Sequence, residues 1–389
     1  MPKLKLTLLH RDAFLCTVMT FMIAGIIYGI FINLSVLDPF EKAFKDFNFT
    51  DIFYSKQFKS AQRNDDIIIV NIKHADRFQI ARAIDKVGNQ NPKAMGLDII
   101  FKERKQPFFD SILKNTISAQ DMLITSYYRD KDSVVRNDPY FKGKSEKEGY
   151  INLNLHGQNT VIRDFIGLKQ DNERAFATQL AMEAGYIDHS FAQKKLIHRL
   201  PINYIGNESA FLTFDIEEVI NSESIPAIKN AIVLFGYLGD GNNEFDIEDK
   251  HFTPMNEAWV GRAVPDTYGV VIHANVLNML TQSSFIKRLP RFIVYLMAFA
   301  ICFFVIMIVM RIYKKSNLAY DITIKVIQLV ISVILLYAAF VLLKMRVYIN
   351  TAPILIISVL GIEMIEYYGY LVEYLNKKFK WKSYLLDSL

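Results

Sequence analysis

Cysteine is almost absent from this chain of 389 residues, which contains only two. Cys16 and Cys302 both lie in long hydrophobic runs, so the polar middle of the chain has none. A disulfide framework is therefore excluded there, and packing must stabilise this part of the chain. With about 250 residues, the middle is long enough to bury a core without cross-links.

Sequence signatures of catalysis are also missing. We find no nucleophile elbow, no glycine-rich phosphate loop and no histidine pair at zinc-binding spacing. The glycines of GYLGDG, residues 236–241, do not match the dinucleotide-binding fingerprint. The sequence therefore predicts a protein that is not an enzyme, with no catalytic residue and no cofactor. The net charge of +5 comes partly from basic clusters beside hydrophobic runs, so we expect no nucleic-acid partner.

Hydrophobic residues make up 51% of the chain and are concentrated in four long runs. The runs cover residues 13–37, 291–311, 322–343 and 350–374. Each is long enough to form a helix that crosses a bilayer. The first run is longer than the apolar part of a signal peptide, and no small-residue cleavage site follows it. We therefore expect an uncleaved anchor.

Basic residues beside these runs predict the orientation of the chain. Three clusters border the runs: Lys3, Lys5 and Arg11; Arg311, Lys314 and Lys315; and Lys377, Lys378, Lys380 and Lys382. Four crossings place all three clusters on one side, which the positive-inside rule makes the cytoplasm. Residues 1–12 and 375–389 are then cytoplasmic, and residues 38–290 form an extracytoplasmic domain. We expect a multi-pass protein of a bacterial inner membrane, with this domain in the periplasm or outside.

In the extracytoplasmic domain, short apolar runs alternate with segments of helical periodicity. The predicted strands are 65–72, 93–101, 122–128 and 231–238, and the predicted helices are 77–90, 107–119 and 269–280. Residues 150–168 predict a hairpin whose turn lies near His156. Strands that alternate with helices through short links favour an α/β domain, with a mostly parallel sheet flanked by helices.

Polar residues that follow the buried strands are candidate ligand contacts, because ligands of open α/β sheets bind beyond the carboxyl ends of the strands. Asp98 follows one strand, and Asp240, Asp249 and His251 belong to an acidic loop after another. Acidic residues around a histidine suit a hard cation, but this loop does not have the spacing of a calcium loop. We therefore predict no metal, and a solvated loop with backbone contacts is the alternative to a ligand site.

The segment GVVIHANVLNML, residues 269–280, places polar side chains in an otherwise apolar helix. His273 is either a buried histidine satisfied by hydrogen bonds or a ligand contact. Asn275 is expected to bond to a neighbouring loop. The helix precedes the second hydrophobic run by about ten residues, so we also expect it to couple the outer domain to the membrane.

Glu363 and Glu366 are three residues apart, on one face of the last hydrophobic run. Carboxylates inside a bilayer normally face protein or water. Three interpretations remain open: a proton or ion path, pairing with a partner protein, and a tilted helix whose glutamates reach the cytoplasmic interface beside an aromatic belt.

Five stretches resemble the motifs of a known family. They are DDIIIVNI (65–72), RFQIARAIDKV (77–87), PKAMGLDIIF (92–101), VLFGYLGDG with EDKHFTP (233–254) and YGVVIHANVLNMLTQ (268–282). Together with the order of one hydrophobic run, a large domain and three further runs, they resemble type-2 CHASE proteins. The name stands for cyclase- and histidine-kinase-associated sensing extracellular domain. The motif positions, candidates for ligand binding or a structural role, are Arg77, Asp98, Asp240, Asp249, His251, His273 and Asn275.

The resemblance implies a sensory domain. Members of this family typically carry a cytoplasmic kinase or cyclase after the last span, whereas about fifteen residues follow it here. We therefore expect a sensor without its own output domain, which binds an unknown small ligand or an envelope protein and acts through a separately encoded effector. The alternative is a structural or accessory subunit of a multi-protein envelope assembly.

Overall fold

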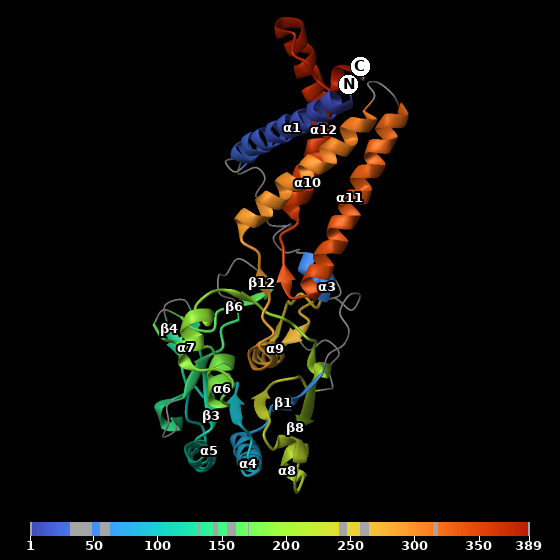
Figure 1. Cartoon of the computed structure of the whole chain (residues 1–389). Helices are drawn as coiled ribbons and strands as arrows, with labels where there is room; N and C mark the ends of the chain where they lie inside the picture. The colour runs from blue at the N-terminus through green and yellow to red at the C-terminus, as the bar shows by residue number, and fades with distance from the viewer. Residues whose placement is uncertain are drawn as a thin grey trace. The chain divides into compact units, whose positions relative to one another are not determined.

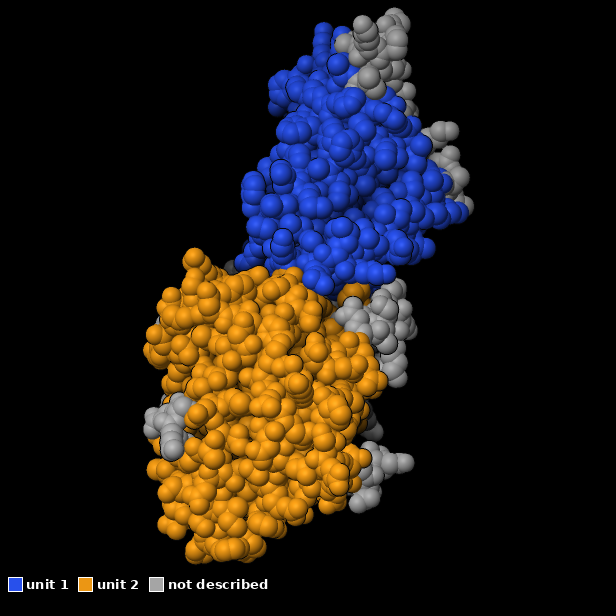
Figure 2. All heavy atoms as spheres, turned by 60° about the horizontal axis from the view of Figure 1, so that its bottom comes forward, with its two compact units in different colours: residues 1–42, 287–389 blue, residues 43–286 orange. Residues whose placement is uncertain are grey.

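The chain divides into two compact units (Figure 1, Figure 2). Residues 43–286 form the sheet unit, and residues 1–42 with 287–389 form the helical unit. The computed structural model describes residues 2–31, 49–54, 63–130, 133–142, 147–153, 161–169, 171–240, 247–256, 264–313 and 318–387.

A seven-stranded sheet organises the sheet unit. Its order is β4-β3-β2-β9-β1-β8, and β5 also pairs with β3. The strands are β1 (Asn64–Asn71), β2 (Ala94–Leu97), β3 (Leu123–Asp130), β4 (Ser133–Val135), β5 (Glu148–Tyr150), β8 (Phe211–Asp215) and β9 (Ile232–Gly236). All pairs are parallel except β3 with β4. β1 lies between β8 and β9, which explains why its apolar run is buried on both faces.

Helices cover both faces of this sheet (Figure 1). On one face, α4 (Arg77–Gly88), α5 (Pro107–Ala119) and α8 (Ile216–Asn221) share a hydrophobic core with β1, β2 and β9. On the other face, α6 (Phe176–Glu183) contacts β2 and β3, and α9 (Gly269–Thr281) contacts β1 and β9. The apolar spacing of α4 and α5 matches this arrangement, because their buried residues recur every three or four positions.

Two glycines allow α6 and α9 to approach the sheet closely. A Cβ atom on Gly96 of β2 would lie 2.7 Å from the Phe176 ring of α6. A Cβ atom on Gly236 of β9 would lie 2.6 Å from the Val270 side chain of α9. Both distances are shorter than van der Waals contact, so a larger residue would push the helix away.

Several short elements complete the sheet unit. They are α3 (Phe49–Tyr54), β6 (Asp164–Phe165), α7 (His189–Phe191), β7 (Leu200–Pro201), β10 (Lys250–His251) and β11 (Thr267–Tyr268), with turns of 3-10 or π helix at Pro139–Phe141, Ala192–Leu196, Glu208–Ala210 and Pro226–Ile228. The predicted hairpin over 150–168 is wrong. β5 pairs in parallel with β3, whereas β6 pairs antiparallel with β7. The open edge of β3 offers β5 a ready row of backbone partners. The predicted turn near His156 lies outside the described residues.

Among the residues that the structure describes, the helical unit contains four helices that are long and apolar enough to cross a membrane. They are α1 (Pro2–Phe31), α10 (Arg291–Ile312), α11 (Leu318–Lys344) and α12 (Ala352–Phe379). α10 packs closely on α12, where a Cβ atom on Gly361 would lie 2.5 Å from the Cys302 sulfur. The mostly parallel sheet with flanking helices, and the order of one long apolar helix followed later by three more, confirm the predicted fold class.

Two polar contacts join distant parts of the helical unit. Asp12 of α1 is fully buried and accepts hydrogen bonds from the Ser383 hydroxyl at 2.6 Å and the Tyr384 amide at 2.7 Å. The first helix is thereby fastened to the residues that follow α12. Separately, β12 (Lys287–Arg288) pairs in parallel with β13 (Val347–Tyr348), so the segment before α10 is held beside the segment before α12.

Candidate ligand-binding site

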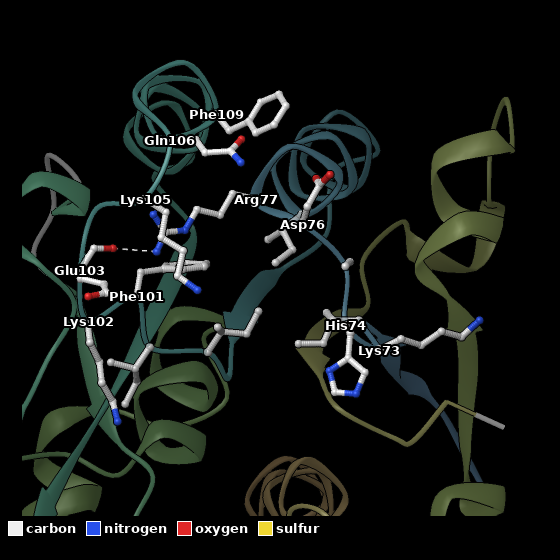
Figure 3. Close-up of a pocket in the computed structure, with 15 residues that line it drawn as sticks. Lys73, His74, Asp76, Arg77, Phe101, Lys102, Glu103, Lys105, Gln106 and Phe109 are labelled. Atoms are coloured by element: carbon white, nitrogen blue, oxygen red, sulfur yellow. Dashed lines mark hydrogen bonds between the residues drawn. The ribbon is translucent and has the colours of Figure 1, made fainter. Parts of the chain in front are cut away.

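A pocket of about 850 Å³ lies at the carboxyl edge of the sheet (Figure 3). Two loops form it with the first turns of the helices that follow: residues 72–76 join β1 to α4, and residues 98–106 join β2 to α5. Pockets for small molecules have volumes in this range, and in open α/β sheets they lie beyond the carboxyl ends of strands. The geometry therefore defines a candidate site for a small ligand.

Arg77 fixes the wall of this pocket. It is the first residue of α4, which begins at a capping box formed by Asp76 and Gln79. The Arg77 guanidinium pairs with the carboxylate of Asp110 and donates a hydrogen bond to the Glu103 carbonyl at 2.6 Å. It also lies over the Phe101 ring, with 5.4 Å between the guanidinium carbon and the ring centre. Arg77 therefore joins the β2–α5 loop to α4 and α5.

The partner carboxylate, Asp110, is fully buried in the first turn of α5. Its burial alone would raise its pKa. The hydrogen bonds from Arg77 and from the Lys105 amide, together with the positive charge of Arg77, instead hold the pKa below its usual range. The carboxylate therefore stays charged and keeps the loop folded over the start of α5.

Asp240, which follows β9, lies near the same loops. Its carboxylate is 3.2 Å from Nε2 of His74, a residue that lines the pocket. The His74 ring also lies against the Tyr237 ring, with 5.3 Å between centres. Asp240 is therefore connected to the pocket through His74.

A second polar cluster contains four of the predicted residues: Asp98, Asp249, His251 and His273. Side chains alternate along β2, so Asp98 points to the face that Gly96 presents to α6, away from the α4–α5 core. The His251 ring lies 3.8 Å from the Asp249 carboxylate. Asp249, at φ +54°, places this carboxylate beside Gly269 at the start of α9. The fold thus brings together residues from three separate parts of the sequence.

The cluster shifts two pKa values in opposite directions. Burial raises the pKa of Asp98 to about 8, and the nearby charge of Asp249 adds to this. Burial lowers the pKa of His273 to about 4, which outweighs the opposite effect of Asp249. At neutral pH a protonated Asp98 and a neutral His273 are therefore favoured.

His273 is 6% exposed, and its ring packs edge-on against Phe176 with 5.5 Å between centres. Among the described residues, neither ring nitrogen of His273 makes a hydrogen bond. His273 is therefore buried, but the predicted hydrogen bonds to its ring are not formed by these residues. Nor do any three His, Cys, Asp or Glu side chains of the described part form a set that could hold a metal ion.

Asn275 has a structural position on α9. Its side-chain oxygen accepts a hydrogen bond from the Ile205 amide at 2.7 Å, and its nitrogen donates to the Gly206 carbonyl at 2.9 Å. The predicted contact with a neighbouring loop is confirmed. One turn later, Asn278 accepts a hydrogen bond from Asn64 of β1 at 2.8 Å. These contacts fix α9 against the sheet.

Glu363 and Glu366 have different partners in the helical unit. Lys325 of α11 lies 2.5 Å from the Glu363 carboxylate, and Gln328 donates a hydrogen bond to it at 2.8 Å. Glu366 instead accepts a hydrogen bond from the Tyr370 hydroxyl at 3.0 Å. The two glutamates therefore do not share one site.

Sequence reasoning missed most of the residues that line the pocket. The missed side chains that are charged or carry a ring are Lys73, His74, Asp76, Phe101, Lys102, Glu103, Lys105 and Phe109. A signal was present in FKERKQP, residues 101–107, where basic residues follow a buried strand directly. The pattern has no periodicity, so it resembled an ordinary solvated loop.

The structure thus combines an α/β domain that has a pocket at the carboxyl edge of its sheet with four described helices long and apolar enough to cross a membrane. The family model of the CHASE2 domain matches residues 20–311, so the chain belongs to the CHASE2 family. CHASE2 is a sensory domain rather than a catalytic one. No curated protein and no solved structure matches the chain.

Proposed function

We propose that this protein is an extracytoplasmic sensor anchored in a bacterial inner membrane, and that it binds a small ligand in the pocket between the β1–α4 and β2–α5 loops. The pocket of about 850 Å³ at the carboxyl edge of a CHASE2 domain is the observation on which this proposal rests. Arg77 would act as a positioning residue, because its contacts with Asp110 and Glu103 are already made within the chain.

The orientation proposed is that predicted from the basic clusters, with residues 38–290 in the periplasm or outside. The signal is proposed to leave through α9. This helix contacts β1 and β9, and the loop after β1 lines the pocket. Only nine residues, 282–290, separate the end of α9 from the start of α10. Ligand-dependent movement of α9 would therefore reach the helical unit through a short connection.

We propose further that the signal passes to a separately encoded effector in the membrane or the cytoplasm. The experiment for the ligand is native mass spectrometry of the full chain, purified from its host in lipid nanodiscs. The wild type should retain a small molecule, and Ile99→Trp, which fills the pocket, should lose it. Val134→Trp, a comparable change at the exposed sheet edge, should retain the molecule. Equal occupancy in both variants would contradict a ligand in this pocket.

One observation favours the alternative, a structural or accessory subunit of an envelope assembly. The Lys325 and Glu363 side chains are 66% and 47% exposed within this chain, although both belong to helices long enough to cross a membrane. Polar side chains in such positions often face other helices. Two measurements would favour the accessory role together. Ile99→Trp would fully complement a deletion strain, and the double variant Lys325→Leu, Glu363→Leu would no longer migrate with a complex on native gels.

A further inference from the structure

The pocket is lined by more cationic than anionic side chains. Its cations are Lys73, Arg77, Lys102 and Lys105, and its carboxylates are Asp76 and Glu103. One of the carboxylates is already used, because the Asp76 side chain accepts the Gln79 amide in the capping box of α4. The lining therefore favours a ligand of negative charge.

Three of the four cations have partners within the chain. Arg77 pairs with Asp110, and Lys73 lies 2.8 Å from Asp215. Lys102 donates a hydrogen bond to the Tyr128 hydroxyl at 3.1 Å. Among the residues that the structure describes, the Lys105 ammonium has no such partner. Figure 3 labels Lys105 among the residues that line the pocket, on the loop that joins β2 to α5.

The start of α5 adds backbone hydrogen-bond donors beside Lys105. Gln106 precedes this helix of 13 residues and makes no side-chain cap, and Pro107 occupies its first turn. The amides of Phe108 and Phe109 therefore have no cap among the described residues, whereas α4 is capped by a carboxylate. The Lys105 amide bonds to Asp110 at 2.8 Å, which folds Lys105 over this first turn.

Apolar side chains line the rest of the pocket. Ile72, Ile80 and Ile99 face it from the strand ends and α4. Phe109 lines it from α5, and its ring lies 5.8 Å from the Phe78 ring. A ligand that contacted only the cationic groups would leave these apolar side chains in contact with water, which is unfavourable.

We propose that the pocket binds a small organic anion. Its carboxylate or phosphate group would lie between the Lys105 ammonium and the first amides of α5, and its apolar part would lie against Phe109 and Ile99. This inference rests on the proposed function, because it specifies the ligand of the same pocket.

The experiment measures binding of chosen probes to the full chain in nanodiscs by isothermal titration calorimetry. The probes are phenyl phosphate, phenylacetate, inorganic phosphate and the neutral benzyl alcohol. Phenyl phosphate or phenylacetate should bind more tightly than benzyl alcohol and inorganic phosphate, because only these two combine charge with a ring. The tighter of the two distinguishes a phosphate from a carboxylate ligand.

Variants then assign the charge. Lys105→Gln should weaken binding of the anionic aromatic probes about tenfold, the effect of one charge-assisted hydrogen bond, and Lys105→Arg should restore most of it. Lys229→Gln should have no effect, because Lys229 is exposed and precedes β9, at the opposite edge of the sheet.

Three results would overturn the inference: benzyl alcohol binding as tightly as the anions, equal affinities in Lys105→Gln and Lys229→Gln, or no binding of either anionic aromatic probe. A failure here is distinguishable from a failure of the proposed function. A neutral molecule retained by the wild type and lost in Ile99→Trp would preserve the ligand pocket and remove only its preference for anions.

Discussion

Replacing Asp98 with asparagine should remove the pH dependence of the protein's stability between pH 6.5 and 8. Asp98 has its pKa raised from 3.8 to about 8 in the folded chain, and His273 has its pKa lowered from 6.5 to about 4. Both shifts arise mainly from burial, so both groups titrate differently after unfolding.

The two effects oppose each other below pH 6.5. Between about pH 4 and 6.5, Asp98 keeps a proton in the folded chain and releases it in the unfolded chain. Asp98 therefore makes the free energy of unfolding fall as the pH rises. Over the same range, His273 binds a proton in the unfolded chain but not in the folded chain. His273 therefore makes the free energy of unfolding rise as the pH rises, and this stabilisation is lost as the pH falls. Each has a slope of about 1.36 kcal/mol per pH unit, and the slopes cancel.

Above pH 6.5 only Asp98 still contributes a slope. From pH 6.5 to about 8, the free energy of unfolding should fall by about 2 kcal/mol if Asp98 were fully shielded. Asp98 is partly exposed, and screening by solvent reduces this to about 1 kcal/mol. Above pH 8 the stability should no longer change through this group.

The assay is thermal unfolding of the full chain in nanodiscs, followed from pH 4.5 to 9. The wild type should lose about 2–4 °C of melting temperature between pH 6.5 and 8. Asp98→Asn should be flat there and should instead gain stability from pH 4.5 to 6.5, because His273 then acts alone. Asp121→Asn, an exposed control, should follow the wild type. Parallel curves for the wild type and Asp98→Asn would refute this account of the cluster.

Three further changes test the packing and the polar contacts. Gly236→Val should destabilise the protein by about 2 kcal/mol, measured by chemical unfolding, because the new side chain overlaps α9. Arg77→Ala should cost about 3 kcal/mol by leaving the buried Asp110 carboxylate unpaired, and adding Asp110→Asn should recover part of this loss. Asp12→Ala should release the residues after α12, so trypsin should cleave at Lys382 faster than in the wild type while α10 stays protected.

The parts of the fold that sequence reasoning predicted are those with a local pattern. β1 has a short continuous apolar run, and α4, α5 and α9 have apolar residues at helical spacing. These patterns depend only on neighbouring residues, so the type and place of the four elements were predictable. The hairpin over 150–168 failed because strand pairing depends on which edge is free elsewhere in the sheet. β5 joins β3, and β6 joins β7, through contacts that no short window of sequence contains.

The candidate site divides in the same way. Asp98, Asp249 and His273 were predicted individually from their positions after strands or in a helix. They lie in one cluster because β9 is inserted between β1 and β2 in the sheet. The spacing of the strands along the sequence does not determine this strand order. Lys105 was missed because a single lysine in a polar loop differs from its neighbours only in what the fold places around it.

The short pairing of β12 with β13 has a mechanical consequence. Backbone hydrogen bonds of 2.8 Å from Lys287 to Arg346 and 3.0 Å from Leu289 to Tyr348 clamp the stretch of chain that leaves the sheet unit to the stretch that leads into α12. A displacement of residues 287–289 would therefore act on β13 as well as on α10. Because β13 lies between α11 and α12, and the Arg346 amide bonds to the Leu343 carbonyl at the end of α11, the movement should reach all three helices together.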